Sequence, residues 1–354
     1  MMKKIFYWAM VAGVVLASCS KSEEITSPEE EQIVHLKVKK AGVYTKNSAS
    51  GVNGNDANDN TINTLEIFLF KSNGALETYK KYTAEQITAA GGLTNLEIKS
   101  TAGQKNIYVI ANSKMDNWTG YIDESYFLER ACNLASENYQ NFTMSGSTSA
   151  TISGAGSVEI TISRLVARVV VTGISTAFTG TPYQGQELRD VKLYLANVHS
   201  SKNFMGTGFA SPTILNNGGY DASSNSGLTI SNMLYDVIMP SIDDDNAYTT
   251  DHYFYCYENQ TSSETSSLKF TRLILEAKLN GNKYYYPVDI NQEGFGYVAA
   301  NAHYGVRRNT SYSFDFVITG PGVLDPSDKL ISYTLTVNTS VSGWSGAQEY
   351  SVSF

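Results

Sequence analysis

The chain has 354 residues, a formal net charge of −8 at pH 7 and only three cysteines. An acidic chain whose adjacent basic residues form nothing longer than pairs such as Lys39-Lys40 disfavours nucleic acid as a partner. Three cysteines are too few for the disulfide framework of a small secreted scaffold. Tyrosine (24) and glycine (28) are plentiful, while only 17% of the residues are charged, which favours many strands joined by turns.

The N-terminus has the pattern of a bacterial lipoprotein signal peptide over residues 1–18. Lys3 and Lys4 precede an uncharged apolar run, which ends in two small residues directly before Cys19. The run is too short to cross a bilayer as a permanent helix. The pattern indicates that the Cys19 thiol is acylated and becomes N-terminal after cleavage. Apart from this lipid, we expect no cofactor.

Residues 19–46 are expected to form a polar, acidic tether followed by one strand. Val34, Leu36 and Val38 alternate with polar residues, which is the period-two pattern of a strand with one buried face. Lys46 follows at the start of a polar loop, the kind of exposed backbone that proteases cut. Cleavage there would detach the strand.

Residues 47–160 are predicted to form a first β-domain with two short helices. Strands are predicted at residues 65–70, 95–98 and 106–111. Thr83 and Gln86 have the spacing of a capping box and predict the start of the first helix. A second helix is predicted over residues 121–134, with apolar positions at Ile122, Tyr126, Phe127 and Leu134.

Residues 161–354 are predicted to form a second β-domain, with the boundary near residues 156–164. Long loops rich in Gly, Ser, Asn and Asp separate its apolar runs. Helical segments between the strands are missing, which favours antiparallel sandwiches over a βαβ fold. Strands are predicted at residues 158–162, 165–171, 190–198, 253–257, 273–279, 284–290, 312–318 and 333–337.

Motifs for catalysis or metal binding are weak. The four histidines are far apart, and none has a paired metal-ligand spacing. Neither a nucleophile elbow nor a phosphate-binding loop stands at a strand-to-helix turn, so we expect no enzyme, no catalytic residue and no metal ligand. The acidic run at residues 243–246 has oxygen ligands for a cation but no EF-hand spacing, and we interpret it as a solvated loop tip.

Two groups of side chains leave alternatives open. Tyrosines clustered at residues 253–257 and 284–286 could form a sugar platform, although tyrosine is also a preferred strand residue, and we expect core and sheet-surface positions. Cys132 and Cys256 could pair or remain as buried thiols, and the sequence does not decide between these.

The last residues of the chain offer a strand that suits the groove the first strand would leave. Tyr350, Val352 and Phe354 alternate with serines, and an apolar groove with unpaired backbone groups templates another strand. Three buried apolar side chains at roughly 1.5–3 kcal/mol each and several backbone hydrogen bonds at about 1 kcal/mol each give on the order of 10 kcal/mol. That suffices for a persistent head-to-tail polymer.

Several segments share their order and spacing with one known family. They are residues 104–112, residues 163–169 with Arg164, Ala167 and Arg168, residues 191–197 leading to Phe204-Met205-Gly206, residues 308–312 followed by 318–322 and Pro326, and the terminal strand with Trp344. Together they make the chain resemble the fimbrillin type of major fimbrial subunit, the type V pilins that Gram-negative anaerobes secrete as lipoproteins.

The resemblance implies a mainly β fold of two tandem transthyretin-like antiparallel β-sandwich domains with a few short helices. It also implies an outer membrane lipoprotein precursor whose first strand is removed outside the cell. The mature subunit would polymerise with other pilin subunits through C-terminal donor strands, in extracellular fimbriae that serve adhesion.

The maturation site departs from the family pattern. The best-known members are cut after an arginine, whereas the first arginine here is Arg130, inside the first domain. Cleavage between Lys46 and Asn47 by a trypsin-like or lysine-specific protease is the expectation, with Lys40 as the fallback. Two alternatives remain: an uncut, lipid-anchored subunit at the pilus tip or anchor, and a monomeric surface adhesin that binds a glycan or a host protein.

Overall fold

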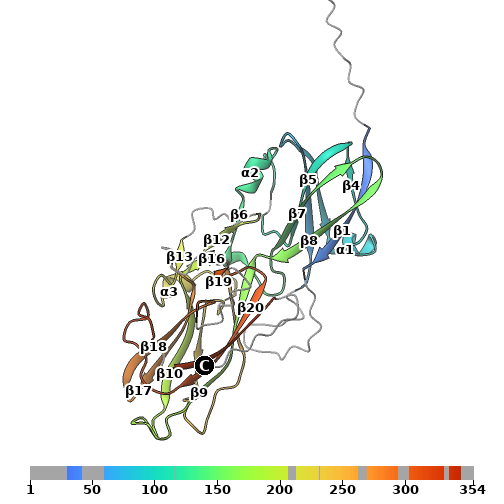
Figure 1. Ribbon diagram of the computed structural model, residues 1–354. Coiled ribbons are helices and arrows are strands. Elements are labelled where there is room, and N and C mark those ends of the chain that lie inside the picture. Colours follow the sequence, from blue (N-terminus) through green and yellow to red (C-terminus); the bar gives the residue numbers. More distant parts are fainter. Residues whose placement is uncertain are drawn as a thin grey trace, which may run out of the picture.

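The computed structural model describes residues 30–41, 60–115, 117–205, 213–230, 232–261, 269–293, 303–330 and 335–343. These residues form two β-domains that lie end to end (Figure 1). Within these ranges, no helix is long and apolar enough to cross a membrane. The predicted sites outside them are Cys19, Lys46, Asn47, Tyr350, Val352 and Phe354.

The first domain is built on one curved sheet of seven strands in the order β3-β2-β5-β7-β8-β1-β4. The strands are β1 (Gln32–Lys40), β2 (Thr64–Lys71), β3 (Leu76–Thr83), β4 (Leu96–Ser100), β5 (Gly103–Ala111), β7 (Met144–Ile152) and β8 (Gly156–Arg164). The two edge strands, β3 and β4, lie close to each other. The Thr78 hydroxyl and the Lys80 ammonium of β3 donate hydrogen bonds to the carbonyls of Lys99 and Glu97 in β4. The sheet therefore wraps around its own apolar core.

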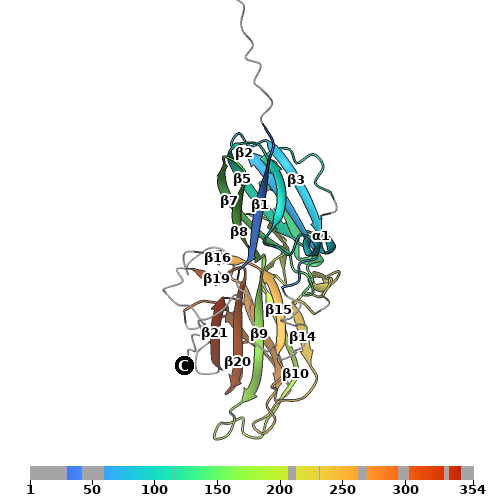
Figure 2. The same ribbon diagram turned by 90° about the vertical axis from the view of Figure 1, so that its right-hand side faces the viewer.

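The second domain packs two four-stranded sheets against each other, in the orders β14-β10-β17-β18 and β15-β9-β20-β21 (Figure 2). The strands are β9 (Val166–Thr176), β10 (Leu188–Ala196), β14 (Tyr235–Ile238), β15 (His252–Tyr257), β17 (Arg272–Leu279), β18 (Asn282–Asp289), β20 (Thr310–Ile318) and β21 (Leu335–Gly343). Alternate residues of these strands fill the space between the sheets, among them Val169, Leu193, Leu275 and Phe314. The two-domain β-sandwich prediction is confirmed.

Short strand pairs complete the fold near the contact between the domains. They are β6 (Ala131–Asn133) with β12 (Ser201–Asn203), β11 (Val198–His199) with β13 (Ile214–Leu215), and β16 (Asn259–Thr261) with β19 (Tyr304–Val306). The first sheet continues to Arg164 and the second domain begins at Val166. The predicted domain boundary between residues 160 and 161 therefore falls inside β8. Leu165 is the residue between the last strand of the first domain and the first strand of the second.

The strand direction differs from the purely antiparallel prediction at two places. β1 pairs parallel with β8, and β9 pairs parallel with β20. Parallel neighbours need a crossover connection, and the strands of each pair are far apart in the sequence. Alternation of apolar and polar residues indicates which face of a strand is buried, but it carries no information about the direction of its neighbour.

The first predicted helix is present. Helix α1 (Ala84–Ala89) begins after Thr83, which accepts a hydrogen bond from the Gln86 backbone N–H, and the Gln86 side chain accepts one from the Thr83 N–H. This is the reciprocal capping that the spacing predicts. A further short helix, α3 (Ala222–Asn225), lies in the second domain after its N-cap Asp221.

The second predicted helix is much shorter than residues 121–134. Helix α2 (Glu124–Leu128) ends before β6, which pairs with β12 of the second domain. Phe127 and Leu134 are buried as predicted, but Ile122 and Tyr126 are 72% and 61% exposed. The prediction was wrong in extent because pairing with a distant strand displaced the local helical preference.

Candidate functional site

Strand β1 lies between two other strands of the first sheet (Figure 2). On one side it pairs antiparallel with β4, from Gln32 opposite Ser100 to Leu36 opposite Leu96. On the other side it pairs parallel with β8 along residues 34–40. Departure of β1 would therefore break two hydrogen-bonded ladders and leave one unpaired edge on each neighbour, with a slot between them.

The side chains of β1 follow the predicted alternation. Val34, Leu36 and Val38 are 1%, 0% and 2% exposed and belong to the core of the first domain. The opposite face carries Lys37 and Lys39, which are exposed. Lys39 forms an ion pair with Glu159 of β8, but such exposed pairs contribute little. The strand is thus held by its backbone and by three apolar side chains.

A cluster of polar side chains closes the C-terminal end of this slot. The Lys40 ammonium donates to the carbonyl of Asn60 at 3.2 Å, and the Arg164 guanidinium donates to the side-chain oxygens of Asn60 and Asn309. Burial lowers the pKa of Lys40, and the positive charge of Arg164 lowers it further. Two cations thus lie near each other where β1 ends, so removal of β1 would relieve their repulsion.

Arg308 ties the first sheet to the second domain. Its guanidinium donates to the carbonyls of Arg164 at 2.9 Å, Ser163 at 2.6 Å and Ser145 at 3.2 Å. These acceptors lie at the ends of β7 and β8. The sequence motif at residues 308–312 marks this segment, but the partners of Arg308 are visible only in the folded chain.

A buried polar network lies beside the same contact between the domains. The Tyr257 hydroxyl is 3.0 Å from Glu137 Oε1 and 3.1 Å from the Cys132 Sγ. Burial raises the pKa of Glu137 above its usual range and likewise raises the pKa of the Cys132 thiol. Burial also raises the pKa of Cys256 to about 12. Neither cysteine forms a disulfide, so of the two alternatives the buried thiols are the observed one.

The acidic run at residues 243–246 has an internal structural role. Asp244 Oδ1 accepts hydrogen bonds from the Thr176 hydroxyl and the Phe178 N–H, and Oδ2 accepts from the N–H and hydroxyl of Thr179. Asp243 accepts from the N–H and side chain of Asn246. Asp244 thus fastens this loop to the end of β9, whereas Asp243 stabilises the loop itself. Within the described residues, no group of three potential ligands could hold a metal ion.

The Asp244 contacts predict an acid-dependent loss of stability. Hydrogen bonds, first that from the Phe178 N–H, lower the pKa of Asp244 from 3.8 to about 2 in the folded state. Because the pKa of Asp244 is lower in the folded than in the unfolded chain, its ionised carboxylate stabilises the fold above pH 3.8. This stabilisation is lost as the pH falls toward 2. Asn at this position cannot ionise, so the Asp244→Asn variant should show a smaller drop in unfolding midpoint across this window.

Urea denaturation at several pH values between 5 and 2 measures this difference, with Asp245→Asn on the same loop as the matched control. Asp245 is exposed, and the control should retain the pH dependence of the unmodified chain. Equal pH profiles for Asp244→Asn and Asp245→Asn would contradict the role assigned to Asp244.

The clustered tyrosines are mainly core residues, as expected. Tyr253, Tyr255 and Tyr257 are all buried in β15. In the second cluster Tyr286 is buried and its hydroxyl donates to the carbonyl of Gly320, while Tyr285 packs on the outer face of the sheet. They therefore provide no flat platform for a sugar.

The described geometry is that of a two-domain β-sandwich protein whose first strand occupies a slot in its own first domain. Residues 34–178, which run from β1 through β9, match the family model of the major fimbrial subunit protein (FimA). The chain is 27% identical over 321 residues to the major fimbrium subunit FimC of Porphyromonas gingivalis, which covers 86% of this chain. It spans 63% of the length of that relative.

Solved structures share the fold over nearly the whole chain. A fimbrilin (FimA) from Porphyromonas gingivalis superimposes with a TM-score of 0.64 at 18% identity, covering 90% of this chain and 98% of that one. A protein from Parabacteroides distasonis gives a TM-score of 0.64 at 20% identity, covering 91% of this chain and 100% of that one. The chain is therefore similar to major fimbrial subunits of the fimbrillin type, and it shares the fold of the solved fimbrilin.

Proposed function

We propose that this chain is a non-catalytic structural subunit of an extracellular fimbria that serves adhesion. The precursor is exported to the outer membrane through a lipid on Cys19, and cleavage between Lys46 and Asn47 releases β1. Subunits then join when residues Tyr350, Val352 and Phe354 of one copy enter the slot of the next. The family and its relatives are named as fimbrial subunits, which supports the general assignment.

The observation that carries the proposal is the position of β1. Among the described residues it is the first strand, it precedes Lys46 in the sequence, and it lies between β4 and β8 with both edges paired. Its three buried side chains have the spacing i, i+2 and i+4, and so do Tyr350, Val352 and Phe354. A donor strand of this pattern can restore both ladders and refill the same side-chain positions.

The structure also bears on the choice between the two candidate cleavage sites. Lys40 is the last residue of β1, pairs with Ile162 of β8 and is only partly exposed. A protease needs an extended segment that can leave the fold, and strand residues in a ladder resist this. This supports cleavage at Lys46, and mass spectrometry of surface-extracted protein should find Asn47 at the mature N-terminus.

Assembly after cleavage is the direct test of the proposal. Protein cut at Lys46 should form ladders or filaments, seen by gel electrophoresis without boiling and by electron microscopy. Removal of residues 348–354 should abolish them, because the donor strand is then missing. If the cut full chain and the truncated chain both stay monomeric, strand exchange is ruled out.

A reversible lock on β1 sharpens this test. His35 of β1 is directly opposite Glu97 of β4, and both side chains point away from the apolar core. The variant His35→Cys with Glu97→Cys should form a disulfide that holds β1 in place even after the chain is cut. The buried Cys132 and Cys256 should not compete for this reaction.

The locked protein should remain monomeric after cleavage and should polymerise when a reductant is added. The two single-cysteine variants are the matched controls and should polymerise with or without reductant. Polymerisation of the oxidised double variant, at the rate of the controls, would show that β1 does not need to leave.

A further inference from the structure

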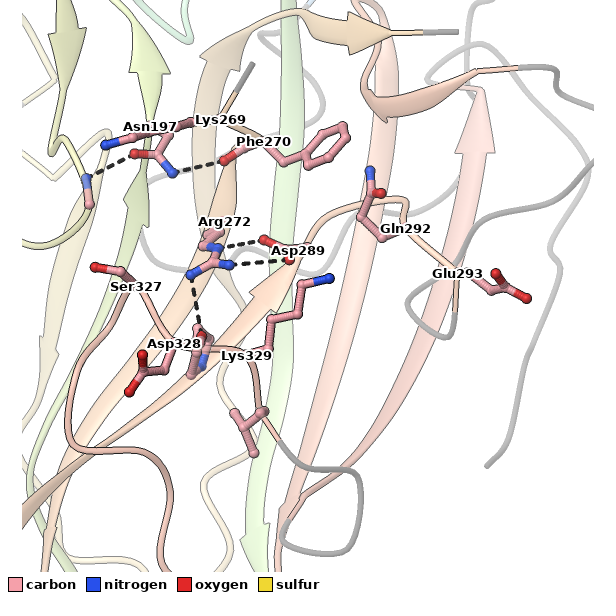
Figure 3. A pocket seen from close by; sticks show the side chains of 13 residues that line it. Asn197, Lys269, Phe270, Arg272, Asp289, Gln292, Glu293, Ser327, Asp328 and Lys329 are labelled. Carbon is pink, nitrogen blue, oxygen red and sulfur yellow. Dashed lines mark hydrogen bonds and ion pairs between the residues drawn. The ribbon is translucent and has the colours of Figure 1, made fainter. Parts of the chain in front are cut away.

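The second domain contains a cavity of about 490 Å³ on the outer face of the sheet β14-β10-β17-β18 (Figure 3). Its floor is formed by Arg272 at the start of β17 and Asp289 at the end of β18, which are directly opposite in the sheet. Gly218 and Ser327 contribute from two loops at its rim. This volume is within the range of small-molecule sites, roughly 300–1,000 Å³.

Arg272 organises the floor and one wall of the cavity. It donates to both carboxylate oxygens of Asp289 and, through Nη1, to the carbonyls of Pro326 at 3.0 Å and Asp328 at 3.3 Å. The ion pair is partly accessible, with side-chain exposures of 14% and 17%. Each Asp289 oxygen accepts one of these bonds and has a further lone pair available. The cavity thus has a preorganised acceptor at its base.

Gln292 supplies a buried polar atom without a partner. It lines the cavity and is only 4% exposed. Its Nε2 donates to the carbonyl of Asn291 at 3.3 Å, whereas in the described part of the chain its Oε1 has no hydrogen-bond partner. A buried unpaired acceptor costs about 1–3 kcal/mol, and a turn of the Gln292 amide toward the cavity would let a ligand hydroxyl satisfy it.

The side chains that line the cavity carry equal numbers of positive and negative charges. The charged residues that line the cavity are Lys269, Arg272, Lys329, Asp289, Glu293 and Asp328. Equal numbers of cations and anions favour neither a phosphate nor an organic cation. Phe270, Pro287 and Leu330 add apolar surface beside these groups. A ligand with many neutral hydroxyls and apolar C–H faces matches this combination, because each hydroxyl both donates and accepts.

We propose that this cavity binds a neutral carbohydrate of one or two sugar units. The Asp289 carboxylate accepts from one sugar hydroxyl, the Gln292 amide turns toward the cavity so that its Oε1 accepts from another, and Phe270 packs against a C–H face of the ring. The site lies in the second domain, away from the slot of β1, and it does not depend on strand exchange. It differs from the clustered tyrosines considered in the sequence, which are mostly buried.

The test uses the uncut full chain in detergent on an array of neutral oligosaccharides printed beside their sialylated and sulfated counterparts. The neutral sugar with the highest signal is then titrated calorimetrically. Gln292→Ala should weaken binding about tenfold, the loss of roughly one hydrogen bond. Ser327→Trp should abolish binding, because Ser327 is an exposed rim residue where a large ring would block the entrance.

Gln104→Ala is the matched control, since Gln104 is an exposed glutamine of β5 in the first domain, and it should bind like the unmodified chain. Thermal unfolding midpoints show that each variant is folded. No signal from neutral sugars, binding of charged sugars only, or equal affinity of folded Ser327→Trp would each overturn the proposal. None of these results affects the assembly tests, because the uncut chain retains β1.

Discussion

Replacement of Leu36 by alanine is expected to destabilise the uncut chain by about 2–5 kcal/mol. Leu36 is fully buried at the centre of β1, where it packs in the core of the first domain. Removal of its branched end loses burial free energy and leaves a cavity that the paired strands on both sides cannot close. Urea denaturation followed by circular dichroism measures the change.

The neighbouring Lys37 provides the matched control. Its side chain is exposed on the other face of β1, so Lys37→Ala should change the free energy of unfolding by no more than about 0.5 kcal/mol. Equal effects of the two substitutions would mean that β1 is not packed as the structure shows.

The same substitution also tests whether β1 leaves during maturation. After cleavage and assembly, the donor strand of a neighbouring subunit occupies the slot under the proposed function, and residue 36 is no longer part of the particle. Polymers assembled from the Leu36→Ala chain should therefore have the stability of unmodified polymers, although the two precursors differ. A stability difference that persists in the polymers would contradict the departure of β1.

Replacement of Arg308 by alanine is expected to cost about 3 kcal/mol or more in the free energy of unfolding. Three backbone carbonyls of the first sheet, those of Ser145, Ser163 and Arg164, lose their charged donor. Hydrogen bonds to charged groups contribute about 1.5–3 kcal/mol each, and carbonyls left unpaired near the contact between the domains add a desolvation penalty.

Arg307 is the control for Arg308, because its side chain is exposed one position earlier in the chain. Arg307→Ala should leave the denaturation curve within about 0.5 kcal/mol of the unmodified chain. Arg308→Lys should fall between the two alanine variants, since a single ammonium cannot reproduce the fork of a guanidinium. If Arg308→Ala unfolds like Arg307→Ala, this contact is not a structural link between the domains.

Local patterns in the sequence predicted those features that depend on neighbouring residues only. The alternation of Val34, Leu36 and Val38 identified both the strand and its buried face, because side chains along a strand alternate between two faces. The spacing of Thr83 and Gln86 identified the start of α1, because the reciprocal hydrogen bonds that cap a helix are made within four residues.

Features that depend on distant residues were not predictable in the same way. The extent of α2 was decided by β6, which pairs with β12 about seventy residues further along. The acidic residues at 243–246 have the composition of a cation-binding loop. In the folded chain, however, Asp244 accepts hydrogen bonds from Thr176 and Thr179. The cavity around Arg272 and Gln292 has no signal in the sequence, because its lining comes from five separate segments.

The sequence by itself therefore determined the β-rich class, the two-domain organisation, the strand at residues 34–38 and the family resemblance. Only the tertiary structure decided that β1 lies between β4 and β8, parallel to one and antiparallel to the other. The reason is physical: a side-chain pattern records which face of a strand avoids water, whereas the identity and direction of its neighbours depend on packing the whole chain.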